Sequence, residues 1–152
     1  MQPDPIEFAH EDAERETTLA RAEAYSNELT TDVVTIRLAR RVMKWRYDKQ
    51  EQVFWLGQGK ISYRSVSSFS PLTHYTDALL VFETVSKDHS IIAMRHLLSL
   101  VFQKEYEEPE LLMQSFTFQD MEKLVFARPI QFCYAALMTA EDVYGENMEE
   151  EC

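Results

Sequence analysis

Two short runs of aromatic and β-branched residues constrain the fold of this chain more than any other feature. The runs cover residues 52–56 and 61–66, and Gly57 and Gly59 lie in the segment that joins them. Glycine readily adopts the positive φ angles that tight connections require, so the pattern predicts a β-hairpin. A third strand is predicted at 111–118, where successive side chains fall on two faces that both include apolar residues.

Helical patterns flank the hairpin on both sides. Residues 6–28 are rich in Ala, Glu and Arg and contain neither Gly nor Pro, which predicts a helix. Apolar residues at helical spacing predict a second helix over 33–47, with Asp32 as its N-cap. A closing helix begins at Pro129, a residue suited to the first helical turn, and Gly145 follows it.

The middle of the chain predicts two further helical segments. The first runs from Pro71 to about Val85, and the residues 87–90 interrupt the pattern after it. Three residues are candidate N-caps for this helix: Ser70, Thr73 and Thr76. Residues 91–104 have apolar side chains at helical spacing and are predicted to form the second helix, with a buried strand as the alternative.

These elements predict an α+β fold in which helices pack on a short three-stranded antiparallel sheet. A length of 152 residues fits one domain, and a 45% apolar content is sufficient for a packed core. We divide the chain into an acidic helical arm at 1–30, the domain itself at 31–142 and an acidic flexible tail at 143–152.

The net charge of −11 arises at the two ends of the chain. Residues 1–30 contain eight acidic and two basic side chains, and residues 138–152 contain six acidic and no basic ones. The segment between them has twelve acidic and thirteen basic residues, so its net charge is +1. We interpret the acidic ends as solvated segments; the alternative is an acidic surface that imitates nucleic acid.

The absence of targeting signals indicates a protein of a reducing cytoplasm. No apolar run approaches the roughly 18–20 residues that cross a membrane, and the first residues lack a secretory signal. The two cysteines, Cys133 and Cys152, do not form a disulfide framework. The apolar neighbours of Cys133 predict a buried, protonated thiol without reactivity.

No catalytic residue, metal site or cofactor is predicted. His89 and His96 are two helical turns apart and have no cysteine nearby, so they do not form a ligand set for one ion. The segment 57–60 joins two strands and does not open a helix, which excludes a phosphate-binding glycine loop. The acidic residues of 105–110 are predicted to be solvated. We therefore expect that the chain is not an enzyme.

Basic residues concentrate at the end of the helix predicted over 33–47. Six of them form the candidate interaction surface: Arg37, Arg40, Arg41, Lys44, Arg46 and Lys49. They could form ion pairs with the acidic arm or with another subunit, bind an anionic partner with stacking on Tyr47, or remain solvated.

Three blocks in a fixed order carry a resemblance to a known family. They are Leu38-Ala39-x-x-Val42-Met43-x-Trp45, then Phe69-Ser70-Pro71 with Thr76-Asp77-Ala78 and Val81-Phe82-Glu83, and finally Pro129-Ile130-x-x-Cys133-x-Ala135-Ala136-Leu137. In this order they resemble the phage ABA sandwich domain, over about residues 33–140. The chain differs from that family at Lys44, where glycine is usual, and in a longer stretch at 86–110.

The resemblance implies an α/β/α sandwich-like fold and a phage or prophage accessory protein made in the host cytoplasm. The family has no catalytic residues or cofactor that carry over to this chain. The implied function is protein binding, in which a host or phage protein is the partner and a host defence factor is inhibited or sequestered. The alternatives are nucleic-acid binding through residues 37–49, which the net charge opposes at long range, and acidic mimicry of nucleic acid.

The Ala-rich faces of the arm predict self-association of the chain through this helix.

Overall fold

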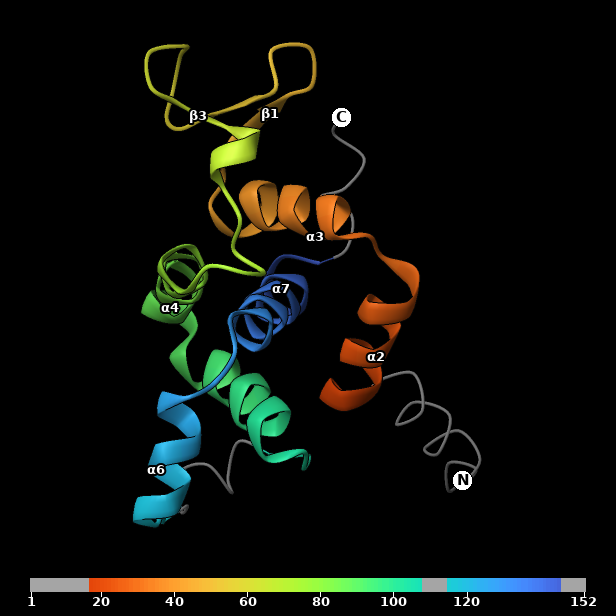
Figure 1. Ribbon diagram of the computed structural model, residues 1–152, viewed down its shortest axis with the longest axis vertical. Coiled ribbons are helices and arrows are strands. Elements are labelled where there is room, and N and C mark those ends of the chain that lie inside the picture. The colour runs from red at the N-terminus through yellow and green to blue at the C-terminus, as the bar shows by residue number, and fades with distance from the viewer. Residues whose placement is uncertain (1–16, 108–114, 146–152) are drawn as a thin grey trace, which may run out of the picture.

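The computed structural model describes residues 17–107 and 115–145 and shows helices packed with a small three-stranded antiparallel sheet (Figure 1), which confirms the α+β class. Along the chain the elements are α2 (Thr18–Glu28), α3 (Thr31–Arg37), the π-helix η1 (Leu38–Val42), β1 (Arg46–Asp48), β2 (Val53–Trp55), β3 (Tyr63–Ser65), the 3₁₀ helix η2 (Val66–Ser68), α4 (Tyr75–Phe102), α6 (Phe118–Val125) and α7 (Pro129–Tyr144).

Helix α7 is the centre of the core, with α2, α3 and α4 around it (Figure 1). Its residues 132–140 are all buried, and the small side chains of Ala135 and Ala136 let neighbouring helices approach closely. Pro129 occupies the first helical turn and Gly145 ends the helix, as predicted from the sequence. The predicted burial of Cys133 is also confirmed.

The sheet contains the predicted hairpin, but its third strand is β1 and not residues 111–118. The strand order is β1-β2-β3, and Tyr47, Phe54 and Arg64 lie in one register row. The Asp48 side chain accepts hydrogen bonds from two backbone amides of the β1–β2 connection, which closes that turn. Residues 108–114 lie outside the described part, whereas Phe118 begins α6, so a strand reaching to 118 is wrong.

The helix predicted over 33–47 begins earlier and ends sooner than expected. Thr30 is the N-cap in place of Asp32, and its hydroxyl accepts a hydrogen bond from the Val33 amide at 3.2 Å. After α3 the backbone widens into η1, and Lys44 then adopts φ 61°. This left-handed residue ends the helix and directs the chain into β1, which begins at Arg46.

The two helices predicted on either side of 87–90 form one kinked helix, α4. The kink lies at His89, where φ is −135° and ψ is 48°, so the interruption is a bend and not a break. The helical interpretation of 91–104 is confirmed up to Phe102. The N-cap is His74, which makes no side-chain cap bond, so the three predicted caps are wrong. Asp77 instead lies in the first turn and accepts a hydrogen bond from the Ser70 amide at 2.9 Å.

The helix predicted over 6–28 is described from Thr18 onward, and its earlier residues lie outside the described part. Thr17 caps it. The carboxylate of Glu105 accepts hydrogen bonds from the amides of Thr18 and Leu19 at 2.8 and 3.0 Å, so this residue is not simply solvated. Helix α2 packs on α4 and α7, which places this part of the predicted arm against the body of its own chain.

Candidate functional site

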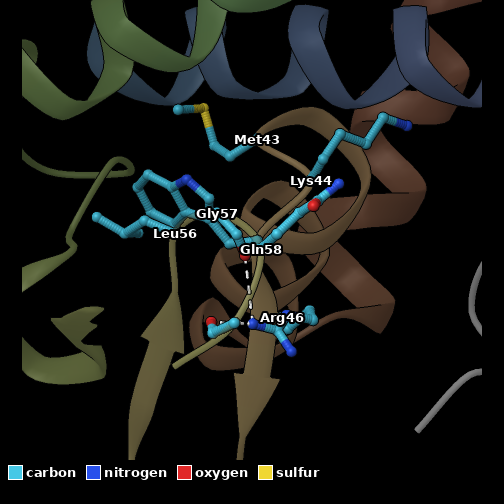
Figure 2. Close-up of a pocket in the computed structure, with 8 residues that line it drawn as sticks. Met43, Lys44, Arg46, Leu56, Gly57 and Gln58 are labelled. Carbon is cyan, nitrogen blue, oxygen red and sulfur yellow. Dashed lines mark hydrogen bonds between the residues drawn. The ribbon is translucent and has the colours of Figure 1, made fainter. Parts of the chain in front are cut away.

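A hollow of about 620 Å³ lies where the chain passes from η1 into β1, opposite the connection between β2 and β3 (Figure 2). Its lining residues come from these two segments only: Met43, Lys44, Trp45, Arg46, Leu56, Gly57, Gln58 and Gly59. Met43, Trp45 and Leu56 provide apolar surface, and Lys44 and Arg46 provide positive charge. The hollow therefore combines an apolar lining with two cations of the candidate interaction surface.

Arg46 joins the two walls of this hollow. Its Nη2 donates to the carbonyl oxygen of Gly57 at 3.2 Å and also to that of Gly59, as the dashed lines of Figure 2 show. Gly59 has a φ of 78°, which turns the connection back towards β3. Arginine has further donors on Nε and Nη1, so Arg46 can hold the connection and still present charge to a ligand.

Lys44 lies at the other end of the hollow. Its ammonium is 3.6 Å from the centre of the Tyr144 ring, close enough for a cation–π interaction. Burial of its side chain lowers the pKa of Lys44.

The solvent-facing side of the sheet continues from this hollow. Arg46, Trp55 and Tyr63 form one cross-strand row on the face opposite to the buried Phe54. The Tyr63 side chain is 62% exposed, and its ring centre lies 5.8 Å from that of Trp55 in an edge-to-face arrangement. The ammonium of Lys60 is 5.8 Å from the Trp55 ring centre. We call these four residues the sheet-face cluster.

The structure divides the six predicted basic residues among different environments. Lys44 and Arg46 line the hollow, and Lys49 is exposed in the β1–β2 connection. Arg37 and Arg40 are half-buried on the helix, and both already interact with other groups. Arg41 is only 2% exposed and pairs with Glu141, so it contributes no binding surface. The six residues therefore do not form one continuous patch.

Arg41 belongs to a buried polar network that joins α2, η1 and α7. The carboxylate of Glu141 accepts hydrogen bonds from Arg41 Nη1 at 2.9 Å, from Arg21 Nη2 at 3.0 Å and from the Tyr25 hydroxyl. Burial and the charge of Glu141 raise the pKa of Tyr25, so its hydroxyl remains a donor. Arg41 thus forms its ion pair with α7 of its own chain, whereas the sequence analysis considered pairing with the acidic arm or with another subunit.

A second chain of hydrogen bonds extends this network to His96. The His96 ring binds Asp142 through Nε2 at 2.7 Å and the Thr18 hydroxyl through Nδ1 at 2.7 Å. The order of hydroxyl, imidazole and carboxylate resembles a nucleophilic triad. Thr18 is only 5% exposed, and Glu105 occupies the neighbouring amides of α2, so a substrate cannot reach the hydroxyl. We interpret these bonds as a clamp that holds α2 in place.

Helix α6 presents an apolar face at the end of the molecule opposite the sheet (Figure 1). Phe118, Met121 and Val125 follow one another at i, i+3 and i+7, and Phe126 caps the helix. Phe118 is 87% exposed, Val125 72% and Phe126 70%. The strand predicted over 111–118 hides this surface in the sequence. The helical spacing of apolar residues from Phe118 to Val125 is the signal that indicates an amphipathic helix.

Neither metal chemistry nor thiol chemistry gains support from the described residues. Over 17–107 and 115–145, no three His, Cys, Asp or Glu side chains gather in a way that could hold a metal ion. Burial raises the pKa of Cys133, which keeps this thiol protonated.

No helix within those same ranges has the length and apolar character needed to cross a membrane.

Comparison of the chain with protein-family models, with curated proteins and with solved structures gives no match to any of them. The resemblance to the phage ABA sandwich domain therefore stays a prediction.

Proposed function

We propose that this chain is a binding protein that inserts the apolar face of α6 into a groove of a partner protein. The observation that carries the proposal is the exposure of four large apolar side chains on one short helix: Phe118, Met121, Val125 and Phe126. Exposed apolar patches on soluble domains commonly mark interaction sites. Apolar residues at i, i+3 and i+7 are the pattern by which a helix binds a groove.

The size of this face favours a groove over a second copy of the chain. An eight-residue helix is about 12 Å long. If each large apolar side chain has a surface of about 150–250 Å², the exposed surface of the four side chains amounts to roughly 500 Å². Two copies pairing through α6 would then bury roughly 1,000 Å², below the about 1,200 Å² of stable interfaces. A groove also covers the flanks of the helix and so buries more.

Helix α6 is ordered in advance for such an interaction. Thr117 and Asp120 form a capping box, in which each side chain accepts a hydrogen bond from the backbone amide of the other. The ammonium of Lys123 lies 5.9 Å from the centre of the Phe102 ring on α4. The capping box fixes the start of the helix and the Lys123 contact joins it to α4, so binding needs little further ordering of the chain.

The resemblance to phage ABA sandwich domains supports a more specific form of this proposal. In that form the chain is a phage or prophage accessory protein of the host cytoplasm, and its partner is a host protein, such as a defence factor, that it inhibits or sequesters. The absence of an accessible catalytic constellation among the described residues is compatible with action by binding.

Affinity capture from a bacterial host lysate, quantified by mass spectrometry, tests the proposal. We compare the native chain with the double variant Phe118→Ser/Val125→Ser and with the control Leu79→Ser/Ile61→Ser, which changes two exposed apolar residues elsewhere. A partner that the native chain and the control retain, and that the α6 variant loses, is the expected result. Equal capture by all three proteins would refute the role of α6.

A further inference from the structure

We propose that the solvent-facing side of the sheet binds single-stranded nucleic acid, with a base stacked on the sheet-face cluster and its phosphate beside the hollow. This site lies at the opposite end of the molecule from α6, so the inference does not depend on the function proposed above (Figure 1). It also differs from the binding mode predicted from the sequence, which placed the contact on residues 37–49 as a helix.

The aromatic part of the site follows from the strand register. Because Trp55 and Tyr63 are directly paired on neighbouring strands, their rings emerge side by side on the same face. The Tyr63 ring is largely exposed, while Trp55 is held in place by a hydrogen bond from its Nε1 to Asp48 at 3.3 Å. A fixed indole beside an accessible phenol ring offers a surface on which bases can stack, irrespective of their sequence.

Positive charge surrounds these rings. Arg46 occupies the third position of the same row, and Lys60 lies above Trp55. The carboxylate of Asp48, two residues after Arg46 on the same strand, accepts hydrogen bonds from two turn amides and from the indole of Trp55. These bonds hold the carboxylate at the turn and beside the indole. The surface as a whole is complementary to a ligand that combines a flat ring with an anionic backbone.

The hollow provides a place for the phosphate next to the stacked base. Arg46 belongs both to the cross-strand row and to the lining of the hollow, so the two features share an edge. Lys44 and residues 57–59 provide the rest of its polar lining, beside the apolar side chains of Met43, Trp45 and Leu56. A volume of about 620 Å³ accommodates a phosphate with its sugar.

The net charge of −11 does not contradict this site, because the acidic residues concentrate in the chain ends. Residues 31–137 carry a net charge of +1, and the sheet lies within them. Salt screens charges that lie more than about 10 Å apart at 0.1 M ionic strength, so the local cations determine binding at the sheet.

Fluorescence anisotropy of labelled oligo(dT) of 20 nucleotides, measured with the full chain at 20 mM and 150 mM salt, tests the inference. We expect binding at low salt, with a log–log salt slope of about −1.4 if two phosphates are neutralised. Tyr63→Ala should weaken binding about tenfold, because it removes a stacking surface. Lys60→Gln should reduce the slope by about 0.7. The matched controls Tyr75→Ala and Lys87→Gln alter exposed residues of α4 and should change nothing.

Three outcomes would overturn the inference. The first is the absence of oligo(dT) binding at 20 mM salt by a chain whose circular dichroism shows that it is folded. The second is binding that Tyr63→Ala and Tyr75→Ala weaken equally. The third is displacement of the oligonucleotide by polyglutamate of matched charge at the same concentration as by unlabelled oligo(dT), since this would show a general polyanion surface without base stacking.

Discussion

Replacing Glu141 with glutamine removes one negative charge from the buried network and changes the side-chain shape very little. Glu141 is the acceptor that Arg41, Arg21 and Tyr25 share, and the side chains of Arg41 and Glu141 are 2% and 10% exposed. Glutamine keeps one carbonyl oxygen but turns the other acceptor into a donor. The variant Glu141→Gln therefore leaves the Arg41 guanidinium buried beside a neutral group.

The expected loss of stability follows from the number of charged contacts. Removing one partner of a buried ion pair costs about 3–5 kcal/mol, because the remaining charge stays buried and loses that opposite charge. One carbonyl acceptor is retained, so we expect a loss of about 3 kcal/mol in the free energy of unfolding. With a urea m-value of about 2 kcal/mol/M, the unfolding midpoint should fall by about 1.5 M.

Urea unfolding followed by the fluorescence of Trp45 and Trp55 measures this change. The control Glu83→Gln makes the same substitution at an exposed position of α4 and should alter the midpoint by less than about 0.3 M, since surface changes stay within about 0.5 kcal/mol. The double variant Arg41→Met/Glu141→Gln removes the buried cation and keeps a carbonyl acceptor for Arg21 and Tyr25, so it should be more stable than Glu141→Gln. A loss below about 1 kcal/mol for Glu141→Gln, or a double variant that is less stable than it, would refute the reasoning.

Four further predictions rest on individual contacts. Burial lowers the pKa of His96, so the folded state binds a proton at this ring less readily than the unfolded state does. The free energy of unfolding should therefore fall as the pH drops below about 6.5. Urea midpoints measured between pH 7.5 and 5 should vary less with pH in His96→Gln, and a pH profile equal to that of the native protein would contradict this. Burial raises the pKa of Asp142, but the hydrogen bond from His96 and the charge of Arg21 outweigh burial and lower it, so a second loss is expected on titration below about pH 4. Thr117→Ala removes the capping box of α6 and should destabilise this helix by about 1 kcal/mol, which is measured as faster hydrogen exchange confined to α6. Exchange equal to that of the native protein would rule out a stabilising role of the cap. Cys133 should react with a thiol reagent only after unfolding, and rapid modification of this residue in folded protein, located by peptide mapping, would show that it is accessible.

The sequence was sufficient to predict the elements that depend on local signals. The hairpin was predictable because its two strands are separated by glycines that supply the turn, and Gly59 indeed has positive φ. The closing helix was predictable because Pro129 and Gly145 delimit an apolar stretch. In both cases the deciding residues are adjacent in the chain, so no tertiary information was needed.

The third strand was not predictable, because tertiary contacts override helical spacing at β1. Trp45 continues the apolar stripe of the helix predicted over 33–47, yet it and Tyr47 lie beyond the left-handed Lys44 and pack on Phe54 of the hairpin. A lysine gives no local signal of positive φ.

The candidate site was only partly predictable for the same reason. Six basic residues close together in the sequence indicated a shared surface, but the bend at Lys44 and the burial of Arg41 separate them in space. Tyr63 and Lys60 join Arg46 through strand pairing, which sequence proximity does not reveal.

The partners of α2 have a consequence for how the protein is made. Arg21 donates a hydrogen bond to Asp142, a residue 121 positions later, and Thr18 contacts His96, 78 positions later. At translation rates of about 5–20 residues per second, the ribosome needs roughly 6–24 s after Arg21 before Asp142 is synthesised. During this interval α2 emerges without its clamp and can be reached by chaperones or proteases.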